Sequence, residues 1–236
     1  MGLKLLFNDF ADVEGRIDIS SVGQVGDEPG YDDPRAVVPL GDWKPISGEE
    51  AEQLRPDADT PADVVLELIS QSLPVFASSE PQQRADAAAA LDPLGGRWPY
   101  RHFVYTASPP GWLTTSEDTS IDRRIGLHID NWDRLPYGSR LNSSRRLCLN
   151  FGPGSRYLLV CDRDIMEVCR VLDRAQEHHY PHTDDVRHYV AEGHPLRCLR
   201  IRLEPGQGYI APTEILPYDG STSGVHEWSL AAFWLG

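Results

Sequence analysis

The chain lacks the sequence features that mark several large classes of protein. Its four cysteines have no Cys-x-x-Cys spacing, so we expect neither a disulfide framework nor a zinc ribbon. No apolar run in its 236 residues is long enough for a secretion signal or a membrane-spanning helix. These absences predict a cytoplasmic protein without a membrane partner.

Positive charge is also scarce, and the motifs of common catalytic classes are missing. Lysine and arginine total 22 against 36 acidic residues, which gives a net charge of −14. Such a surface repels phosphate backbones and anionic lipid, so nucleic acid is not an expected partner. There is no Gly-x-Ser-x-Gly elbow, no Walker-type phosphate loop and no Gly-x-Gly-x-x-Gly after a strand. Hydrolases, kinases and dehydrogenases are therefore disfavoured.

The second half of the chain carries short alternating runs separated by turn signals. The pattern predicts strands at 102–106, 125–129, 146–151, 157–161, 196–203, 208–211 and 225–235, with one helix at about 164–177. Leu199, Ile201 and Leu203 would share one face of their strand, and Arg200 and Arg202 the other. We predict a mainly β fold with flanking helices, with residues 101–236 forming a closed or sandwich-like barrel.

Residues 1–100 are expected to form an N-terminal elaboration, within what is most simply one domain overall. Glycine, proline and aspartate recur up to about residue 58 and predict loops with one or two short strands. Thr60 followed by Pro61 is typical of a helix start. A second helix is predicted from Pro81 to Leu91. Both helices are expected to pack on the barrel.

One short motif indicates chemistry. His128 and Asp130 are separated by one residue in a predicted strand, so both side chains would face the barrel interior. With a second histidine they would form a facial triad for Fe(II). The dipeptide pattern is weak by itself, since His182-Thr183-Asp184 also matches it. The alternative is a strand-end histidine paired with Asp130.

This part of the chain resembles the cupin-like superfamily, in particular the Fe(II)/2-oxoglutarate-dependent dioxygenases. The resemblance covers about residues 101–236 and rests on His128-x-Asp130, the strand pair 146–161 and the Pro-Gly turn and strand of 203–212. It implies a double-stranded β-helix (jelly roll), Fe(II) and 2-oxoglutarate as cofactors, and oxidation of a small molecule. A carboxylate at Asp130 favours hydroxylation or desaturation over halogenation, an outcome compatible with specialised metabolism.

The sequence departs from this family where the distal histidine is expected. The slot five or six residues after Pro212 holds Pro217 and Tyr218. His226, at the start of the predicted last strand, is the candidate third metal ligand. The remaining possibilities are His188 or His194, a site completed by Tyr218, Asp219 or Glu214, or no metal site. The histidine-rich tract 177–194 is predicted to be a polar loop rather than a second metal site.

The predicted last strand contains no arginine to hold the 2-oxoglutarate carboxylate. Arg146 and Arg156 are the candidate donors, because a guanidinium pairs bidentately with a carboxylate. Substrate contacts are expected from residues flanking the pocket mouth, Trp112, Trp132, Arg134 and Tyr137. The competing hypothesis is a cupin-like barrel that binds a small ligand, or catalyses a redox-neutral step, without 2-oxoglutarate. The oligomeric state and the substrate are not encoded in any motif.

Overall fold

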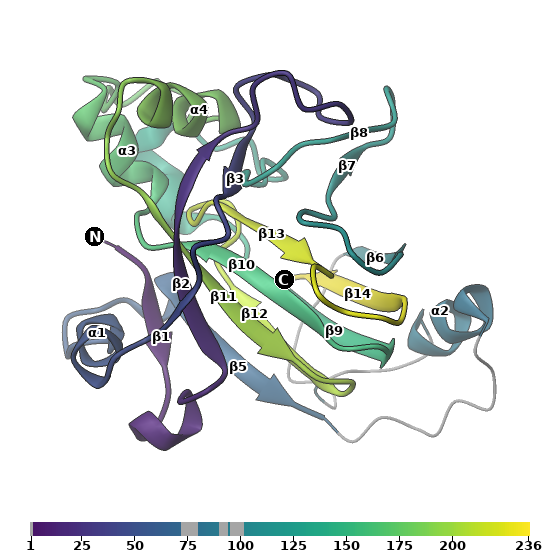
Figure 1. Cartoon of the computed structure of the whole chain (residues 1–236). Coiled ribbons are helices and arrows are strands. Elements are labelled where there is room, and N and C mark those ends of the chain that lie inside the picture. Colours follow the sequence, from purple (N-terminus) through teal and green to yellow (C-terminus); the bar gives the residue numbers. More distant parts are fainter. Residues whose placement is uncertain (1, 72–79, 90–93, 95–101) are drawn as a thin grey trace.

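The computed structural model of the protein describes residues 2–71, 80–89, 94 and 102–236, and two β-sheets dominate it (Figure 1). The first sheet has the strand order β1 (Lys4–Leu6), β5 (Val65–Ser70), β12 (Gln207–Ala211), β9 (Arg146–Pro153), β14 (Ser229–Leu235) and β6 (His102–Ser108). Its neighbours are antiparallel except for β1 and β5, which are parallel.

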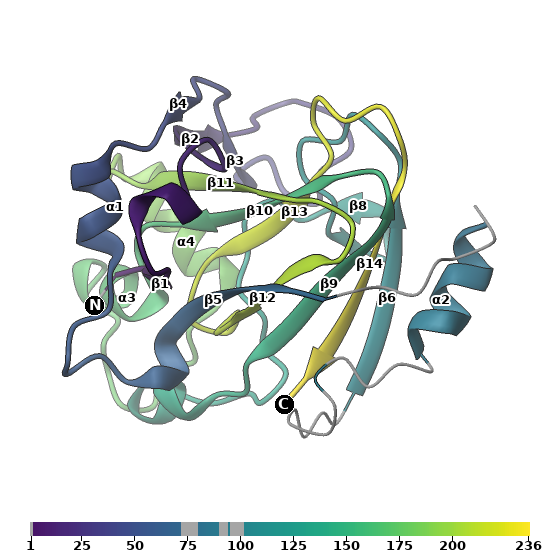
Figure 2. The same cartoon turned by 90° about the horizontal axis from the view of Figure 1, so that it is seen from below.

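The second sheet is antiparallel throughout. Its order is β13 (Tyr218–Ser221), β10 (Arg156–Cys161), β11 (Arg197–Leu203), β2 (Ile17–Gln24) and β3 (Val37–Pro39), and β4 (Lys44–Pro45) also pairs with β2. A separate pair joins β7 (Glu117–Asp118) and β8 (Arg123–Arg124). The curled sheets form a half-barrel, and the mainly β class with few helices is confirmed (Figure 2).

The main core lies between the two sheets. Leu199, Ile201 and Leu203 of β11 are buried there, whereas Arg200 and Arg202 are partly exposed or exposed, as their alternation predicts. They belong to one apolar cluster with residues of the first sheet such as Cys148 and Tyr209. This arrangement leaves inward-facing positions near the ends of the strands available for a site.

Four α-helices flank the sheets in the described part of the chain. α1 (Gly48–Leu54) follows the Ser47 cap, and α2 (Pro81–Ala89) lies beside β14 and β6 (Figure 2). α3 (Ile165–Val171) and α4 (Thr183–Ala191) pack together against the outer face of the second sheet. Three 3₁₀ turns complete the fold, η1 (Phe10–Asp12), η2 (Ala62–Val64) and η3 (Tyr137–Asn142). Among these described residues, none of the helices combines the length and apolar character needed to cross a bilayer.

The predicted helix after Thr60 is wrong. Only the short turn η2 forms, and Val65–Ser70 continues as strand β5 between β1 and β12. The run Val-Val-Leu-Glu-Leu-Ile is rich in β-branched residues, and a short apolar run of this kind suits a buried strand as well as a helix. Pairing on both sides decides in favour of the strand.

The N-terminal region also contains more regular structure than the sequence predicts. Four strands and α1 lie within residues 1–58, where loops with one or two strands are expected. The eight residues of β2 pair with β11, β3 and β4. Residues 2–70 therefore supply strands to both sheets instead of packing outside them. The predicted helix at 81–91 is confirmed as α2 up to Ala89, and Leu91 lies outside the described residues.

Four predicted segments differ in detail. The predicted strand 125–129 does not form, because Gly126 has a positive φ of 79°, and only an isolated bridge joins His128 to Tyr218. β14 begins at Ser229, so His226 lies before the last strand and is exposed. Within the predicted polar loop 177–194, helix α4 begins after its cap His182. The predicted helix 164–177 is confirmed only as the shorter α3.

Candidate functional site

A cavity of about 560 Å³ opens between the two sheets. Its walls come from six strands, β6, β9, β10, β12, β13 and β14, and from the segments 115–119 and 125–132. This volume falls in the range of pockets that bind small organic molecules. Apolar and aromatic side chains form much of the lining, and a few ionisable groups converge on it.

Five of the predicted site residues line this pocket. They are His128, Asp130, Trp132, Arg146 and Arg156. The other four do not line it: Trp112, Arg134, Tyr137 and His226. Tyr137 packs on the apolar cluster beneath α3 and α4, and its hydroxyl donates to the Met166 carbonyl over 3.4 Å. The structure thus assembles the predicted ionisable groups but not the predicted third metal ligand.

Asp130 is the most heavily bonded side chain of the pocket. Its Oδ2 atom lies 2.7 Å from Nη2 of Arg146 and accepts the Thr213 hydroxyl at 2.6 Å. The Tyr218 hydroxyl lies 3.1 Å from Oδ1 and 3.2 Å from Oδ2. Both carboxylate oxygens are therefore engaged by donors within the protein.

Arg146 completes this network from β9. Its Nη1 atom donates to the Tyr218 hydroxyl over 2.5 Å. Burial opposes the charge on Arg146, but the nearby Tyr218 and Asp130 outweigh burial and raise the pKa of its guanidinium. Burial raises the pKa of the Tyr218 phenol, so it is a neutral donor at ordinary pH. Arg146 and Asp130 thus form an ion pair in the pocket wall.

His128 has one ring nitrogen committed to the protein and one available to the pocket. Its Nδ1 atom lies 2.8 Å from the carbonyl oxygen of Gly126. A carbonyl can only accept, so Nδ1 carries the hydrogen and Nε2 of the neutral ring is an acceptor. The backbone of Gly126 lies close against Val37, and a Cβ atom there would collide with the Val37 carbonyl oxygen. Only a glycine can therefore take this position.

A second carboxylate lies behind the imidazole. Oδ2 of Asp219 is 3.9 Å from Nδ1 of His128, and the residue is fully buried. Burial raises the pKa of Asp219, while His128 and the backbone and side-chain donors of Ser116 lower it in part. Its Oδ1 atom accepts three backbone N–H groups, from Thr115, Ser116 and Gly220. Sequence analysis did not assign Asp219 this position behind His128.

Arg156 is the least satisfied charge of the site. It enters from the start of β10 and is only 3% exposed. Its Nη2 atom lies 3.4 Å from the Thr115 hydroxyl, and Nη1 has no hydrogen-bond partner among the described residues. A buried guanidinium without a counterion is costly. Arg156 is one of the residues that line the cavity, and its unpaired guanidinium marks a place where an anion would be stabilised.

The segment that carries His128 and Asp130 is held by a buried arginine in addition to its isolated bridge to Tyr218 of β13. Arg140 in η3 is fully buried and donates to the carbonyl oxygens of Glu214 and Asp130, at 2.9 and 2.7 Å. Its Nη1 atom donates to the Asn131 side chain and lies 3.2 Å from the Glu214 carboxylate. These bonds tie the loop after Asp130 to the turn that precedes β13. The sequence places Arg140 in a polar loop and gives no sign of this role.

The pocket does not assemble the metal ligands that the sequence predicts. A facial triad needs two imidazoles and one carboxylate directed at one point. The pocket offers the imidazole of His128 and the carboxylate of Asp130, but Tyr218 lies beside Asp130 and His226 is outside. The positive charge next to Asp130 is the guanidinium of Arg146. The residues present therefore do not fit an iron site of this type.

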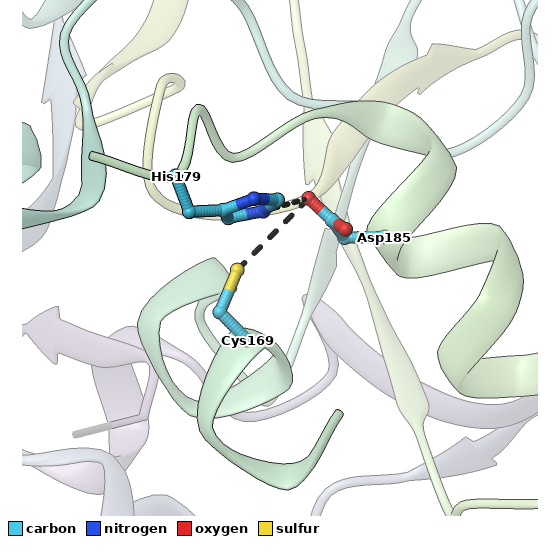
Figure 3. Close-up of side chains that lie close together, drawn as sticks. All are labelled: Cys169, His179 and Asp185. Carbon is cyan, nitrogen blue, oxygen red and sulfur yellow. Dashed lines mark hydrogen bonds and ion pairs between the residues drawn. The ribbon is translucent and has the colours of Figure 1, made fainter. Parts of the chain in front are cut away.

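A different group has donor atoms close enough for a metal ion. Cys169 of α3, His179 and Asp185 of α4 each offer one ligand atom, and these atoms lie within 4.8 Å of one another (Figure 3). Within the described residues, no other group of three such side chains meets this spacing. The sequence did not predict this combination, because Cys169 is distant from the histidine-rich tract.

The donors of this second group already satisfy one another. Asp185 lies 2.6 Å from Arg174 and 3.0 Å from Nε2 of His179, and it accepts the backbone N–H of His182 at 2.8 Å. Burial raises the pKa of the Cys169 thiol to about 12. The thiol is thus protonated at neutral pH, which opposes metal binding. The hydrogen bonds of Asp185 cap the start of α4, and this structural role explains why these side chains lie together.

Comparison of the chain with protein-family models, with curated proteins and with solved structures finds no match. The geometry of the pocket is therefore the basis for a functional proposal.

Proposed function

We propose that this protein binds a small organic molecule in the pocket, without iron–oxoglutarate chemistry. The observation that carries the proposal is the ion pair of Arg146 with Asp130 at 2.7 Å. A guanidinium at that place supplies the charge that a divalent cation would supply, and it repels a second cation. A cavity lined with aromatic groups and a few convergent polar side chains supports small-molecule binding.

The strand order supports the double-stranded β-helix inferred from the family resemblance. Along the chain, β9 lies in the first sheet, β10 and β11 in the second, β12 in the first, β13 in the second and β14 in the first. This alternation between two facing sheets is that of a jelly roll. In such a barrel, the bridge between His128 and Tyr218 continues the second sheet beyond β13. The tyrosine then stands at the slot of the distal histidine.

His128 gives the pocket a capacity for redox-neutral chemistry. Its Nε2 atom can accept a hydrogen bond or a proton from a bound ligand, because Nδ1 donates to the Gly126 carbonyl. Asp219, 3.9 Å behind Nδ1, would stabilise the resulting imidazolium. Binding alone and proton transfer at His128 are both compatible with this arrangement.

Metal binding tests the proposal directly. The Cys169→Ser variant is used as the background, because it removes the other candidate metal group. In this background we expect no visible absorption band from Fe(II) with 2-oxoglutarate under anaerobic conditions, and no d–d band from Co(II). Adding Tyr218→His and Arg146→Met together should create Co(II) absorption, because the pocket then offers two imidazoles and a carboxylate free of its guanidinium.

The Fe(II)/2-oxoglutarate oxygenase predicted from the sequence is the second candidate. The presence of His128 and Asp130 in one pocket favours it. An iron–oxoglutarate band in the Cys169→Ser background that disappears on adding His128→Ala would establish this function and overturn the metal-independent proposal.

A further inference from the structure

We propose that the pocket is specific for a ligand with a single carboxylate, and that Arg156 is the residue that binds it. The inference deepens the proposed function and depends on it in one respect, because it requires that a small molecule occupy the pocket. It assigns the chemical class of the ligand and one specificity-determining side chain.

The first support is the state of the guanidinium. Arg156 is 97% removed from solvent, since 3% of it is exposed, and it lies on the cavity wall. None of the ion pairs among the described residues involves it, and its Nη1 atom has no hydrogen-bond partner there. By contrast, Arg146 on the adjacent wall is bound to Asp130. A carboxylate in the pocket would supply the acceptors that Arg156 lacks.

The second support is the backbone that makes room for this arginine. Gly220 of β13 lies directly against the end of Arg156, and a Cβ atom there would collide with Nη2 of Arg156 and with the Thr115 hydroxyl. The glycine does not need a left-handed conformation, since its φ is not positive. Glycine at position 220 is therefore explained by the close approach of the Arg156 side chain to the backbone of β13. The guanidinium occupies a space that any other residue at 220 would fill.

The charges around the cavity indicate one negative charge on the ligand. Arg146 is neutralised by Asp130, which leaves Arg156 to balance an incoming anion. Glu117 also lines the cavity, and Asp219 lies behind His128. A phosphate or a dicarboxylate would bring two negative charges toward one available cation and these acids. A planar monocarboxylate matches both the charge and the fork of donors on arginine.

The rest of the wall indicates the body of the ligand. Tyr209, Phe233 and Ile129 line the cavity and favour an apolar or aromatic group. The free Nε2 atom of His128 would accept a hydrogen bond from a hydroxyl or amino group of the ligand. The expected class is therefore an aryl or alkyl carboxylic acid.

A pair of probes of nearly the same shape, one a carboxylate and one a neutral amide, tests the assignment. 3-Phenylpropanoate and its neutral amide, 3-phenylpropanamide, are titrated into the protein by calorimetry in metal-free buffer. We expect the carboxylate to bind at least about ten-fold more tightly than the amide, equivalent to about 1.4 kcal/mol. Phenylphosphonate, a dianion near pH 8, should bind more weakly than the carboxylate.

Two variants locate the effect. Arg156→Met should bind both probes with the affinity that the wild type has for the amide, since the cavity remains and the charge is lost. Gly220→Ala keeps the arginine but fills its space, and it should reduce the carboxylate preference without removing amide binding. Amide binding by each variant shows that its pocket is folded.

The outcomes separate this inference from the proposed function. Equal affinity of the wild type for acid and amide would overturn the carboxylate assignment and leave small-molecule binding in place. A carboxylate preference that appears only with Fe(II) would overturn metal independence and leave Arg156 as the carboxylate site. Preference retained in Arg156→Met would assign the anion to another residue, and binding of neither probe would contradict both proposals.

Discussion

Two groups in this protein each place an arginine and a histidine near a buried aspartate, yet they differ in how their charges are satisfied. In the pocket, Asp130 pairs with Arg146, and His128 lies on the same wall. Beside α4, Asp185 pairs with both Arg174 and His179. The α4 group satisfies its charges internally. The pocket contains one further guanidinium, that of Arg156, whose Nη1 atom has no partner in the described structure.

This difference separates a structural network from a candidate binding site. Networks in which each buried charge has a partner stabilise one conformation. A buried charge left unpaired destabilises the empty protein and gains its partner only when a ligand binds. By the spacing of potential metal ligands alone, the α4 group would be the better candidate for a binding site. By the balance of buried charge, the pocket is the better candidate.

The largest change in the free energy of unfolding is expected at the α4 group, where Asp185 pairs with Arg174 and His179. Asp185→Asn removes the partner of Arg174 and His179 while keeping an acceptor for the helix cap. We expect the free energy of unfolding to fall by about 3 kcal/mol, measured by urea denaturation. The matched control is Asp184→Asn, at a half-exposed neighbour that pairs with the buried Arg187, which keeps Asp32 and Asp33 as partners. It should change stability by less than about 1 kcal/mol. Equal effects of the two variants would contradict the structural role of Asp185.

In the pocket, we expect a substitution to raise the free energy of unfolding instead of lowering it. Arg156→Met replaces a buried guanidinium that lacks a partner with an apolar side chain of similar length. Without ligand, the variant should be about 1–2 kcal/mol more stable than the wild type. Arg174→Met, which removes the arginine partner of the buried Asp185 and leaves it His179, should be less stable than the wild type in the same assay. Destabilisation by both variants would show that Arg156 is satisfied in the empty protein.

The two groups should also differ in their pH dependence. Burial raises the pKa of Asp185, but hydrogen bonds from Arg174, His182 and His179 outweigh it and lower the net pKa. The stability that Asp185 contributes is then present above its unfolded pKa of about 3.9 and is lost as pH falls through the lower folded value. The stability difference between wild type and Asp185→Asn should therefore shrink only in acid below about pH 4.

Asp219 should show the reverse behaviour, because burial raises its pKa in the folded protein. Its ionisation costs stability above the folded pKa, and this cost disappears as pH falls toward the unfolded value of about 3.9. The wild type should thus gain stability relative to Asp219→Asn as the pH is lowered. Urea denaturation of the wild type, Asp185→Asn and Asp219→Asn at several pH values should give stability differences from the wild type that change in opposite directions with pH. Differences that change in the same direction would contradict the comparison.

The smallest effect is expected from metal ions at the α4 group. Because the Cys169 thiol has a pKa raised to about 12 by burial, Zn²⁺ must displace its proton to bind. We expect weak Zn²⁺ binding that strengthens from pH 6 to pH 8, measured by calorimetry. Cys169→Ser should weaken it further. Tight binding at pH 6 would instead identify this group as a metal site.

The strands of the second half were predictable because β11 alternates between buried and exposed positions, and β9, β10 and β12 are short, largely buried runs bounded by turn signals. β9, β10, β11 and β12 lie where the sequence predicts them. β5 was not predictable, because its apolar run is continuous and its identity as a strand depends on pairing with β12, more than a hundred residues later. Local sequence carries no record of such a partner.

The composition of the pocket was partly predictable, and the relations within it were not. His128, Asp130, Arg146 and Arg156 were each singled out and do line one cavity. The pairing of Arg146 with Asp130 depends on the packing of β9 against the loop that carries Asp130. Tyr218 was noted at the slot of the missing histidine. Its bond to Asp130 follows from the bridge that pairs Tyr218 with His128, two residues before Asp130.

Arg140 has a consequence for the kinetics of the pocket. The wall that bears His128 and Asp130 belongs to no continuous strand. It is joined to β13 and to the turn before it by the bonds of this side chain, by the Asp130 N–H to the Thr213 carbonyl and by the isolated bridge between His128 and Tyr218. Segments held in this way open locally more often than sheet interiors do. The wall should therefore exchange its amide hydrogens as a unit, faster than β9 or β10. The rate at which this wall opens would then limit the rates at which a buried ligand binds and dissociates.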